Sequence, residues 1–171
     1  MMKRLLALLF SLILMTGLTA CGGGSDNTTP VNPDVPAVEQ PGPFGPGEFG
    51  TISLTADWQV PEGALFLDIR NDWERINIRA AGSVGGAVYE YRAPNGNGSE
   101  RHLMSDFNAN VLTLAGSPNR QIILICHSGS RTQAAARQLS NNGFTNVYMI
   151  EGGMNTWSAI KPAETIYNRP L

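Results

Sequence analysis

The sequence predicts an α/β fold with a mainly parallel central sheet. From about residue 51 to residue 171, short apolar runs alternate with stretches of helical pattern, and no internal repeat interrupts that alternation. The apolar run 121–125 is continuous and rich in β-branched residues, as in strands that are buried on both faces of a parallel sheet. These observations predict one domain with a core of its own.

The first predicted unit is a strand followed by a helix. Residues 64–68 (ALFLD) form an apolar run that predicts a buried strand. Asn71 then has the character of a helix N-cap, and Glu74 three residues later completes the pattern of a capping box. The order strand then helix is the one expected of a parallel sheet.

The middle of the domain is predicted to hold a second strand, a loop and a second helix. Residues 86–89 (GAVY) predict the short strand, and residues 92–101, rich in Gly and Asn, predict a surface loop longer than such a domain requires. Ser105 or Asp106 is the expected cap of a helix that continues through Leu114, because a glycine and a proline follow soon after.

The strongest prediction is a strand, a tight loop and a helix in succession. Residues 121–125 form the expected central strand, residues 126–131 the loop, and residues 132–142 a helix that stops before Gly143. Ligands in open α/β sheets bind where loops leave the carboxyl ends of strands, so this loop is the expected site.

The remaining elements complete the core. Residues 147–150 predict another buried strand, and residues 154–160 predict a short helix after a Glu-Gly-Gly turn. We expect Trp73 and Trp157 to be core aromatics rather than side chains that stack on a substrate.

Residues 1–20 have the pattern of an export signal. Two basic residues precede an apolar run that is too short to span a bilayer, which needs about 20 residues. Leu18-Thr19-Ala20-Cys21 then resembles the bacterial lipobox, which implies cleavage before Cys21 and lipidation of its thiol. The alternatives are an ordinary signal peptide with Cys21 left free, and a small buried Cys.

Residues 21–50 predict a flexible tether. They are dense in Gly, Pro, Asn, Ser and Thr and hold few large apolar residues, so they cannot offset the entropy of ordering the chain. A lipid on Cys21 would hold the protein to a membrane, with the domain facing the periplasm. Gly22, where an Asp would resemble a retention signal, slightly favours the outer over the inner membrane.

Charge and cysteine count exclude some functions. The chain of 171 residues has a formal net charge of −2, and loss of Lys3 and Arg4 with the leader makes it −4. No basic field is available for nucleic acid, and we expect a monomer without a nucleic-acid partner. After lipidation of Cys21, Cys126 is the sole free thiol in a compartment where cysteines usually pair.

The loop Cys126-His127-Ser128-Gly129-Ser130-Arg131 has the residues of a nucleophilic, anion-binding site. A Cys between a central strand and a helix N-terminus lies among converging backbone N–H groups, and that field stabilises a thiolate. The small residues allow the loop to close, and Arg131 adds a fixed cation. The alternative is an inert core cysteine, since free Cys is often buried.

These segments together resemble the rhodanese family of sulfurtransferases. The resemblance covers about residues 51–160, through four motifs in the family's order: Leu67-Asp68-Ile69-Arg70 with Trp73-Glu74, Gly82 to Ala87, Cys126 to Arg131, and Glu151-Gly152-Gly153-Met154 with Trp157. It implies a rhodanese-like three-layer fold, with a central sheet of about five strands flanked by helices.

The resemblance also implies the chemistry. Cys126 would take a sulfane sulfur from thiosulfate or a similar anion, become a persulfide and pass the sulfur to cyanide or a thiol. The amides of residues 127–131 would hold the persulfide, and Arg131 would position the anion. The resemblance implies neither a cofactor nor a metal. Four residues separate Cys126 from Arg131, whereas tyrosine phosphatases need five before their Arg, so phosphatase activity is disfavoured.

Other polar residues have more than one interpretation. Arg70 matches a family position near the pocket mouth and is a candidate anion ligand, or else a surface residue paired with Glu74 at i+4. We expect Asp68 to be structural, fixing loop amides. His127 is expected to line the site rather than act as a base, and His102 to be a solvated surface residue.

Two departures from the family pattern leave a second function open. Ser83-Val84-Gly85-Gly86-Ala87 stands where the family usually has His-Ile-Pro-Gly-Ala, and the loop 92–101 is long enough to gate or border the site. The alternative to catalysis is a non-catalytic rhodanese-like module that binds a partner or senses redox state through Cys126.

Overall fold

A computed structural model describes residues 42–94 and 100–168 of the chain. The predicted leader, the lipidation site Cys21 and most of the predicted tether lie outside these residues. The described elements, in chain order, are β1 (Gly50–Ile52), β2 (Leu65–Asp68), α1 (Asp72–Asn77), β3 (Ile78–Ala80), β4 (Glu90–Arg92), β5 (Arg101–Leu103), α2 (Phe107–Ala115), β6 (Ile122–Ile125), α3 (Ser130–Asn141), β7 (Val147–Ile150), α4 (Gly153–Ile160), the 3-10 turn η1 (Pro162–Glu164) and β8 (Thr165–Tyr167).

The central sheet has four parallel strands in the order β1-β7-β6-β2. Among the described residues, a single bridge between Leu67 and Val84 is all that represents a fifth strand beside β2. The strand predicted at residues 86–89 is therefore wrong. Gly86 has a φ of +106°, which lies outside the extended region, so the chain cannot continue along β2.

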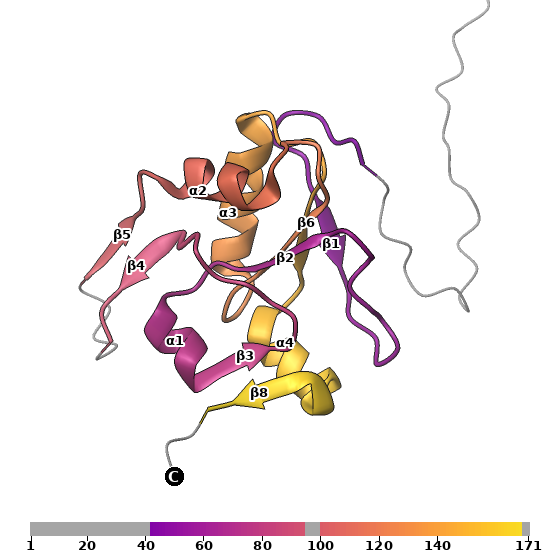
Figure 1. The fold of residues 1–171 in the computed structure, drawn as a ribbon, viewed down its shortest axis with the longest axis vertical. Helices are drawn as coiled ribbons and strands as arrows, with labels where there is room; N and C mark the ends of the chain where they lie inside the picture. Colours follow the sequence, from indigo (N-terminus) through magenta and orange to yellow (C-terminus); the bar gives the residue numbers. More distant parts are fainter. Residues whose placement is uncertain (1–41, 95–99, 169–171) are drawn as a thin grey trace, which may run out of the picture. The chain divides into compact units, whose positions relative to one another are not determined.

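Helices lie on both faces of the sheet (Figure 1), and an apolar layer fills each interface. Alternate residues of β2 and β6 pack on one side with α2 and α3, through residues such as Phe107 and Leu139. The other alternate residues pack with α4 and β3, around the fully buried Trp157. Both faces are covered, which explains the continuous apolar runs of the strands and confirms the three-layer prediction.

The helix boundaries agree closely with the sequence. Asp106 occupies the N-cap position of α2, and the C-cap residue is Gly116, whose φ of +72° suits a helix C-terminus. Helix α3 begins two residues earlier than predicted, at Ser130, and Gly143 follows its end with a φ of +88°. The Glu74 carboxylate accepts a hydrogen bond from the Asn71 backbone N–H at 3.2 Å, as a capping box requires.

The segment that precedes β1 belongs to the folded domain. The Phe44 ring packs edge-on against Tyr148 with ring centroids 5.2 Å apart, and the Phe44 N–H donates to the Thr145 carbonyl at 2.7 Å. The Ser140 hydroxyl donates to the Gly45 carbonyl at 2.7 Å. Gly50 itself is the first residue of β1. The domain thus begins at least eight residues before the predicted end of the tether.

The predicted loop 92–101 begins and ends in strands. β4 and β5 pair antiparallel, with Arg92 opposite Arg101 and Tyr91 opposite His102. The His102 ring is exposed and stacks on Tyr91 with ring centroids 4.8 Å apart, which agrees with a surface role. Residues 95–99 lie outside the described part.

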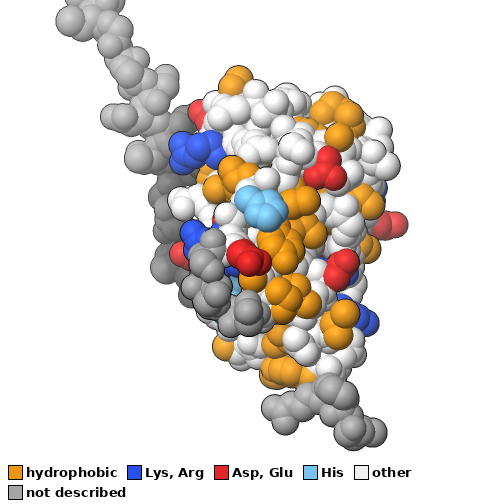
Figure 2. Space-filling model, turned by 90° about the vertical axis from the view of Figure 1, so that its left-hand side faces the viewer, with side chains coloured by type: hydrophobic (Ala, Val, Ile, Leu, Met, Phe, Trp, Pro, Cys, Tyr) orange, Lys and Arg blue, Asp and Glu red, His pale blue; other side chains and the backbone are white. Residues whose placement is uncertain are grey.

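The described surface is mixed in character. In the view of Figure 2, hydrophobic, acidic and basic side chains are interspersed, and a band of hydrophobic side chains runs beside a histidine. The large exposed hydrophobic residues are Ile76, Val84, Leu103, Leu112 and Tyr167. Within residues 42–94 and 100–168, no helix has the length and apolar character needed to cross a membrane.

Candidate active site

Cys126 lies directly after β6, at the carboxyl edge of the sheet, and its side chain is fully buried. The backbone N–H of Gly129 donates a hydrogen bond to Cys126 Sγ at 3.2 Å. The Thr132 hydroxyl donates to the Gly129 carbonyl at 2.8 Å and lies 3.7 Å from Sγ. Gly129 has a φ of +94°, so a residue without Cβ is needed for the loop to turn its amide toward the sulfur.

The N-terminus of α4 fixes the other side of the cysteine loop. The N–H of Met154 donates to the Cys126 carbonyl at 2.8 Å, and that of Asn155 donates to the His127 carbonyl at 3.1 Å. A Cβ on Gly153 would lie 2.5 Å from the Cys126 carbonyl oxygen. The Gly152-Gly153 pair of the fourth motif therefore permits a close backbone approach that helps hold the nucleophile.

Arg131 is almost completely buried and forms a two-pronged ion pair with Glu74. Arg131 Nη2 lies 2.6 Å from Glu74 Oε1, and Nη1 lies 2.8 Å from Oε2. Burial by itself would raise the pKa of Glu74, but hydrogen bonds from Arg131 and Asn71 and the charge of Arg131 together lower it to about 2. Burial would lower the pKa of Arg131, and the hydrogen bond and charge of Glu74 raise it. The cation of the loop is thus held in a neutral pair.

Arg70 forms a second buried pair, with Asp68. Its Nη2 lies 2.7 Å from Asp68 Oδ2 and donates to the Ile78 carbonyl at 2.6 Å. Asp68 also accepts the backbone N–H of Arg70 at 3.2 Å, which agrees with the predicted role in fixing a loop amide. Arg70 is 1% exposed. Its interpretation as a surface residue paired with Glu74 is wrong, because the Glu74 carboxylate is occupied by Arg131.

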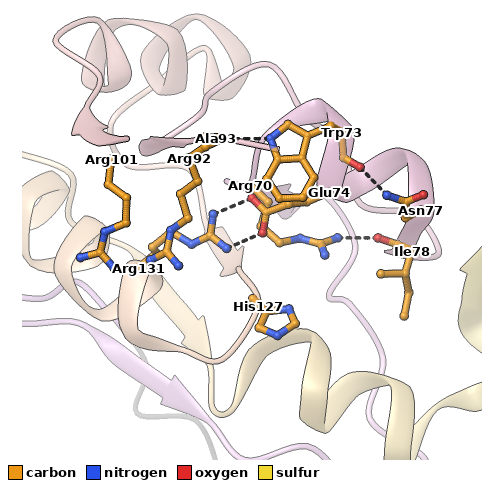
Figure 3. Close-up of a pocket in the computed structure, with 10 residues that line it drawn as sticks. All are labelled: Arg70, Trp73, Glu74, Asn77, Ile78, Arg92, Ala93, Arg101, His127 and Arg131. Carbon is orange, nitrogen blue, oxygen red and sulfur yellow. Dashed lines mark hydrogen bonds and ion pairs between the residues drawn. The ribbon is translucent and has the colours of Figure 1, made fainter. Parts of the chain in front are cut away.

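A pocket of about 510 Å³ lies beside these two ion pairs. Figure 3 shows Trp73 on one side and His127 on the other, with Arg70 and Arg131 between them and the other two arginines to the left. The lining residues are Arg70, Trp73, Glu74, Asn77, Ile78, Arg92, Ala93, Arg101, His127 and Arg131. The pocket therefore joins the cysteine loop, helix α1 and the β4–β5 hairpin.

The predicted loop residues are distributed unevenly around this pocket. His127 and Arg131 line it, whereas Cys126 is fully buried and is not among the lining residues. Ser128 is exposed, and Ser130 lines a separate open depression along α3. The structure brings together Cys126, His127, Gly129, Arg131 and Arg70, and the two serine side chains lie outside that group.

Seven of the ten lining residues were not predicted as site residues, and Trp73, Arg92 and Arg101 are the most informative of them. Trp73 is half-buried and lines the pocket, so its prediction as a core aromatic is wrong, although that of Trp157 is confirmed. The Trp73 indole N–H donates to the Arg92 carbonyl at 3.0 Å, which fixes the ring against the hairpin. Arg92 and Arg101 have no motif of their own, and their only signal is that they flank the long Gly/Asn-rich segment.

The departure at residues 83–87 has a local explanation. A Cβ on Gly85 would lie 1.6 Å from Nη1 of Arg75, so the Arg75 guanidinium occupies the space over this glycine. Arg75 Nε in turn lies 3.9 Å from Asp68 Oδ2. The missing side chain at Gly85 thus allows a second arginine to approach the carboxylate that holds Arg70.

Among the described residues, no group of three or more His, Cys, Asp or Glu side chains could hold a metal ion.

The fold and this site are those of a rhodanese-like domain, and comparison with known proteins agrees. The family model described as Rhodanese-like domain matches residues 55–160, more than half of the chain, so the protein belongs to the rhodanese-like sulfurtransferase family. Over 104 residues the chain is 32% identical to the thiosulfate sulfurtransferase GlpE of Pseudomonas entomophila, an alignment that covers 61% of this chain and 79% of the relative.

Two solved structures are also similar to this chain. The thiosulfate sulfurtransferase from Pseudomonas aeruginosa is similar at 20% identity with a TM-score of 0.46, over 68% of this chain and 20% of that chain. A NAD-dependent persulfide reductase from A. fulgidus is similar at 22% identity with a TM-score of 0.38, and the match covers 64% of this chain and 16% of that one. The chain thus spans a small part of those longer proteins.

Proposed function

We propose that this protein is a sulfurtransferase that carries a sulfane sulfur on Cys126 between thiosulfate, or a similar donor, and cyanide or a thiol. In the first step the Cys126 thiolate attacks the outer sulfur of thiosulfate. The S–S bond of thiosulfate breaks, and its electron pair leaves with sulfite. In the second step the acceptor attacks the outer sulfur of the persulfide, and the electron pair of that S–S bond returns to Sγ as a thiolate.

The hydrogen bond from Gly129 N–H to Cys126 Sγ is the observation that carries this proposal. A backbone donor aimed at sulfur from the start of α3 stabilises negative charge on it without any rearrangement during the reaction. The two carbonyls fixed by α4 keep the loop in this conformation. Arg70 and Arg131, each beside the pocket, are the proposed cations for the donor anion, with the loop amides of residues 127–131 around the persulfide.

Mass spectrometry tests the first step. The chain from residue 21 onward, carrying Cys21→Ser, has Cys126 as its sole thiol. After incubation with thiosulfate we expect a mass gain of one sulfur, about 32 Da, on the Cys126 peptide, and its loss on addition of cyanide. The matched control is the same chain with Cys126→Ser. A mass gain that persists in this control would show that Cys126 is not the sulfur carrier.

Complete burial of the Cys126 side chain supports one second candidate, a partner-binding or redox-sensing module. Such a module needs no access of thiosulfate to sulfur. If the thiol alkylates but takes up no sulfur from thiosulfate, the second candidate replaces the first.

We also propose that the protein is anchored to the cell envelope through a lipid on Cys21 and faces the periplasm, with the outer membrane slightly favoured. The lipobox-like segment and the polar stretch after it support this location. Metabolic labelling with palmitate should mark the protein in its host and fail with Cys21→Ser. Equal labelling of both forms would contradict lipidation at Cys21.

A further inference from the structure

The four arginines around the pocket do not have equal access to a ligand. Arg131 is bound to Glu74 and Arg70 to Asp68, and both arginines are almost completely buried. Each of these inner cations is therefore paired with a carboxylate, and Asp68 also has Arg75 at 3.9 Å. Such pairs carry little net positive charge, so Arg70 and Arg131 would act on the donor anion mainly as positioned N–H donors.

The two outer arginines share one carboxylate. Arg92 Nε lies 2.7 Å from Glu90 Oε1, and Arg101 Nε lies 3.6 Å from the same oxygen. The Arg92 side chain is 30% exposed and that of Arg101 is 53% exposed. The positive charge that remains in the pocket wall after pairing thus belongs to the β4–β5 hairpin and not to the cysteine loop.

The pocket is also larger than an inorganic sulfur anion needs. A volume of about 510 Å³ lies in the range of pockets for organic ligands, about 300–1,000 Å³. Thiosulfate has only five non-hydrogen atoms. Trp73 and Ile78 add apolar side chains to the lining, and Figure 3 shows the Arg92 and Arg101 side chains extending from the hairpin in the same direction.

We propose that Arg92 and Arg101 bind the carboxylate of an organic thiol that accepts sulfur from Cys126. This inference rests on the proposed sulfurtransferase function and names the class of its acceptor. The thiol would lie at the His127 and Arg131 end of the pocket, the carbon chain along Trp73, and the carboxylate at the hairpin. Guanidinium groups in a fork geometry are suited to carboxylates.

The transfer step balances without another reactant. The acceptor thiolate attacks the outer sulfur of the Cys126 persulfide and forms a new S–S bond. The bond between that sulfur and Sγ breaks, and its electron pair stays on Sγ. The products are the acceptor persulfide and the Cys126 thiolate, so Arg92 and Arg101 act by positioning the acceptor and take no part in bond making.

The test compares acceptors that differ in charge at the far end. The chain from residue 21 with Cys21→Ser is loaded with thiosulfate, and single-turnover transfer is measured to 3-mercaptopropionate and to 2-mercaptoethanol at equal thiolate concentrations. We expect the ratio of the two rate constants to fall about tenfold in Arg92→Gln/Arg101→Gln, the loss typical of one charge-assisted contact. The single variant Arg101→Gln keeps the Arg92–Glu90 pair and should show a smaller fall in the same ratio.

The matched control is Arg79→Gln/Arg137→Gln, which removes the same charge from residues that do not line this pocket. Its ratio should stay within about twofold of the unmodified chain, as expected when distant charges are screened. Equal slowing of both acceptors in the hairpin variant would overturn the proposal. An unchanged ratio with slower loading by thiosulfate would also overturn it, because Arg92 and Arg101 would then bind the donor anion and not the acceptor.

A binding measurement separates this proposal from the proposed function. S-methylglutathione has two carboxylates and no free thiol, so its dissociation constant needs no sulfur chemistry. We expect calorimetry to show binding about tenfold weaker in Arg92→Gln/Arg101→Gln than in the control. Weaker binding without any sulfur loading would disprove the transferase and keep the carboxylate site. Sulfur loading together with equal S-methylglutathione binding in both variants would keep the transferase and disprove the carboxylate site.

Discussion

At the scale of single residues, Glu74 connects the helix cap to the cysteine loop. Its Oε2 accepts hydrogen bonds from the Asn71 backbone at 3.2 Å and from Arg131 at 2.8 Å, while Oε1 accepts from Arg131 at 2.6 Å. One carboxylate therefore closes α1 and holds the last residue of the loop. Loss of its charge would leave Arg131 buried without a partner, which is costly.

The lowered pKa of Glu74 predicts how stability depends on pH. The carboxyl has a pKa of about 2 in the folded protein and an ordinary value of 4.5. Its contribution is fully present above pH 4.5 and is lost as pH falls from 4.5 toward 2. We expect Glu74→Gln to remove on the order of 2 to 3 kcal/mol at pH 7 and less at pH 3.

Urea unfolding between pH 3 and 7 measures this difference. Asp72→Asn is a suitable control, because Asp72 is an exposed acidic residue on the same helix. A loss of stability with Glu74→Gln that is equal at pH 3 and pH 7 would contradict the pairing with Arg131.

The sequence identified the residues of the loop but not their partners. Cys126 and Arg131 were found because the strand–loop–helix pattern is local. Glu74 was assigned only to its own helix, since its contact with Arg131 joins positions 57 residues apart. Arg92 and Arg101 were missed for the same reason, because a hairpin across the long loop decides which way they face.

At the scale of elements, the contact between α4 and the cysteine loop depends on the absence of a side chain at Gly153. A Cβ there would meet the Cys126 carbonyl oxygen at 2.5 Å, and Gly153 has a φ of +60°. We expect Gly153→Ala to slow sulfur loading by at least about tenfold and to lower the free energy of unfolding by about 2 kcal/mol.

Gly116→Ala is the matched control for this prediction. Gly116 has a φ of +72°, and a Cβ there would meet nothing within 4 Å. Gly116→Ala should therefore lower the free energy of unfolding, because of the positive φ, without slowing sulfur loading. The interpretation fails if single-turnover loading by thiosulfate is slowed equally in both variants.

Elements with strong local signals were predicted well, and those set by distant pairing were not. The apolar runs of β6 and β7 and the glycine that follows α3 suffice to place those elements. The segment 86–89 has strand-like composition, but Gly86 turns the chain away from β2. β4 and β5 are short and partly exposed, so no apolar pattern marks them.

At the scale of the whole molecule, the domain includes the residues just before β1. Phe44 packs against one apolar layer and Phe49 against the other. The sequence alone assigned these residues to the tether because Gly and Pro dominate the segment. Two isolated aromatics in such a composition give no periodic signal, although they are enough to dock it.

Shortening the chain tests this extension of the domain. A chain that begins at Gly50 should be less stable to urea than one that begins at Pro33 by on the order of 2 to 4 kcal/mol, from loss of two aromatic contacts. A chain that begins at Pro33 should match one that begins at Cys21. Equal stability of the chains that begin at Gly50 and Pro33 would show that the segment adds nothing.

The buried sulfur of Cys126 makes alkylation a measure of loop opening. Because its side chain is 0% exposed, a bulky reagent reacts only in the fraction of molecules whose loop has opened. The alkylation rate constant of Cys126, divided by that of an exposed thiol of equal reactivity, then gives the equilibrium constant for loop opening. Amide exchange gives a protection factor in the same way. Thiosulfate uptake faster than this opening would show that a small anion reaches the sulfur with the loop closed.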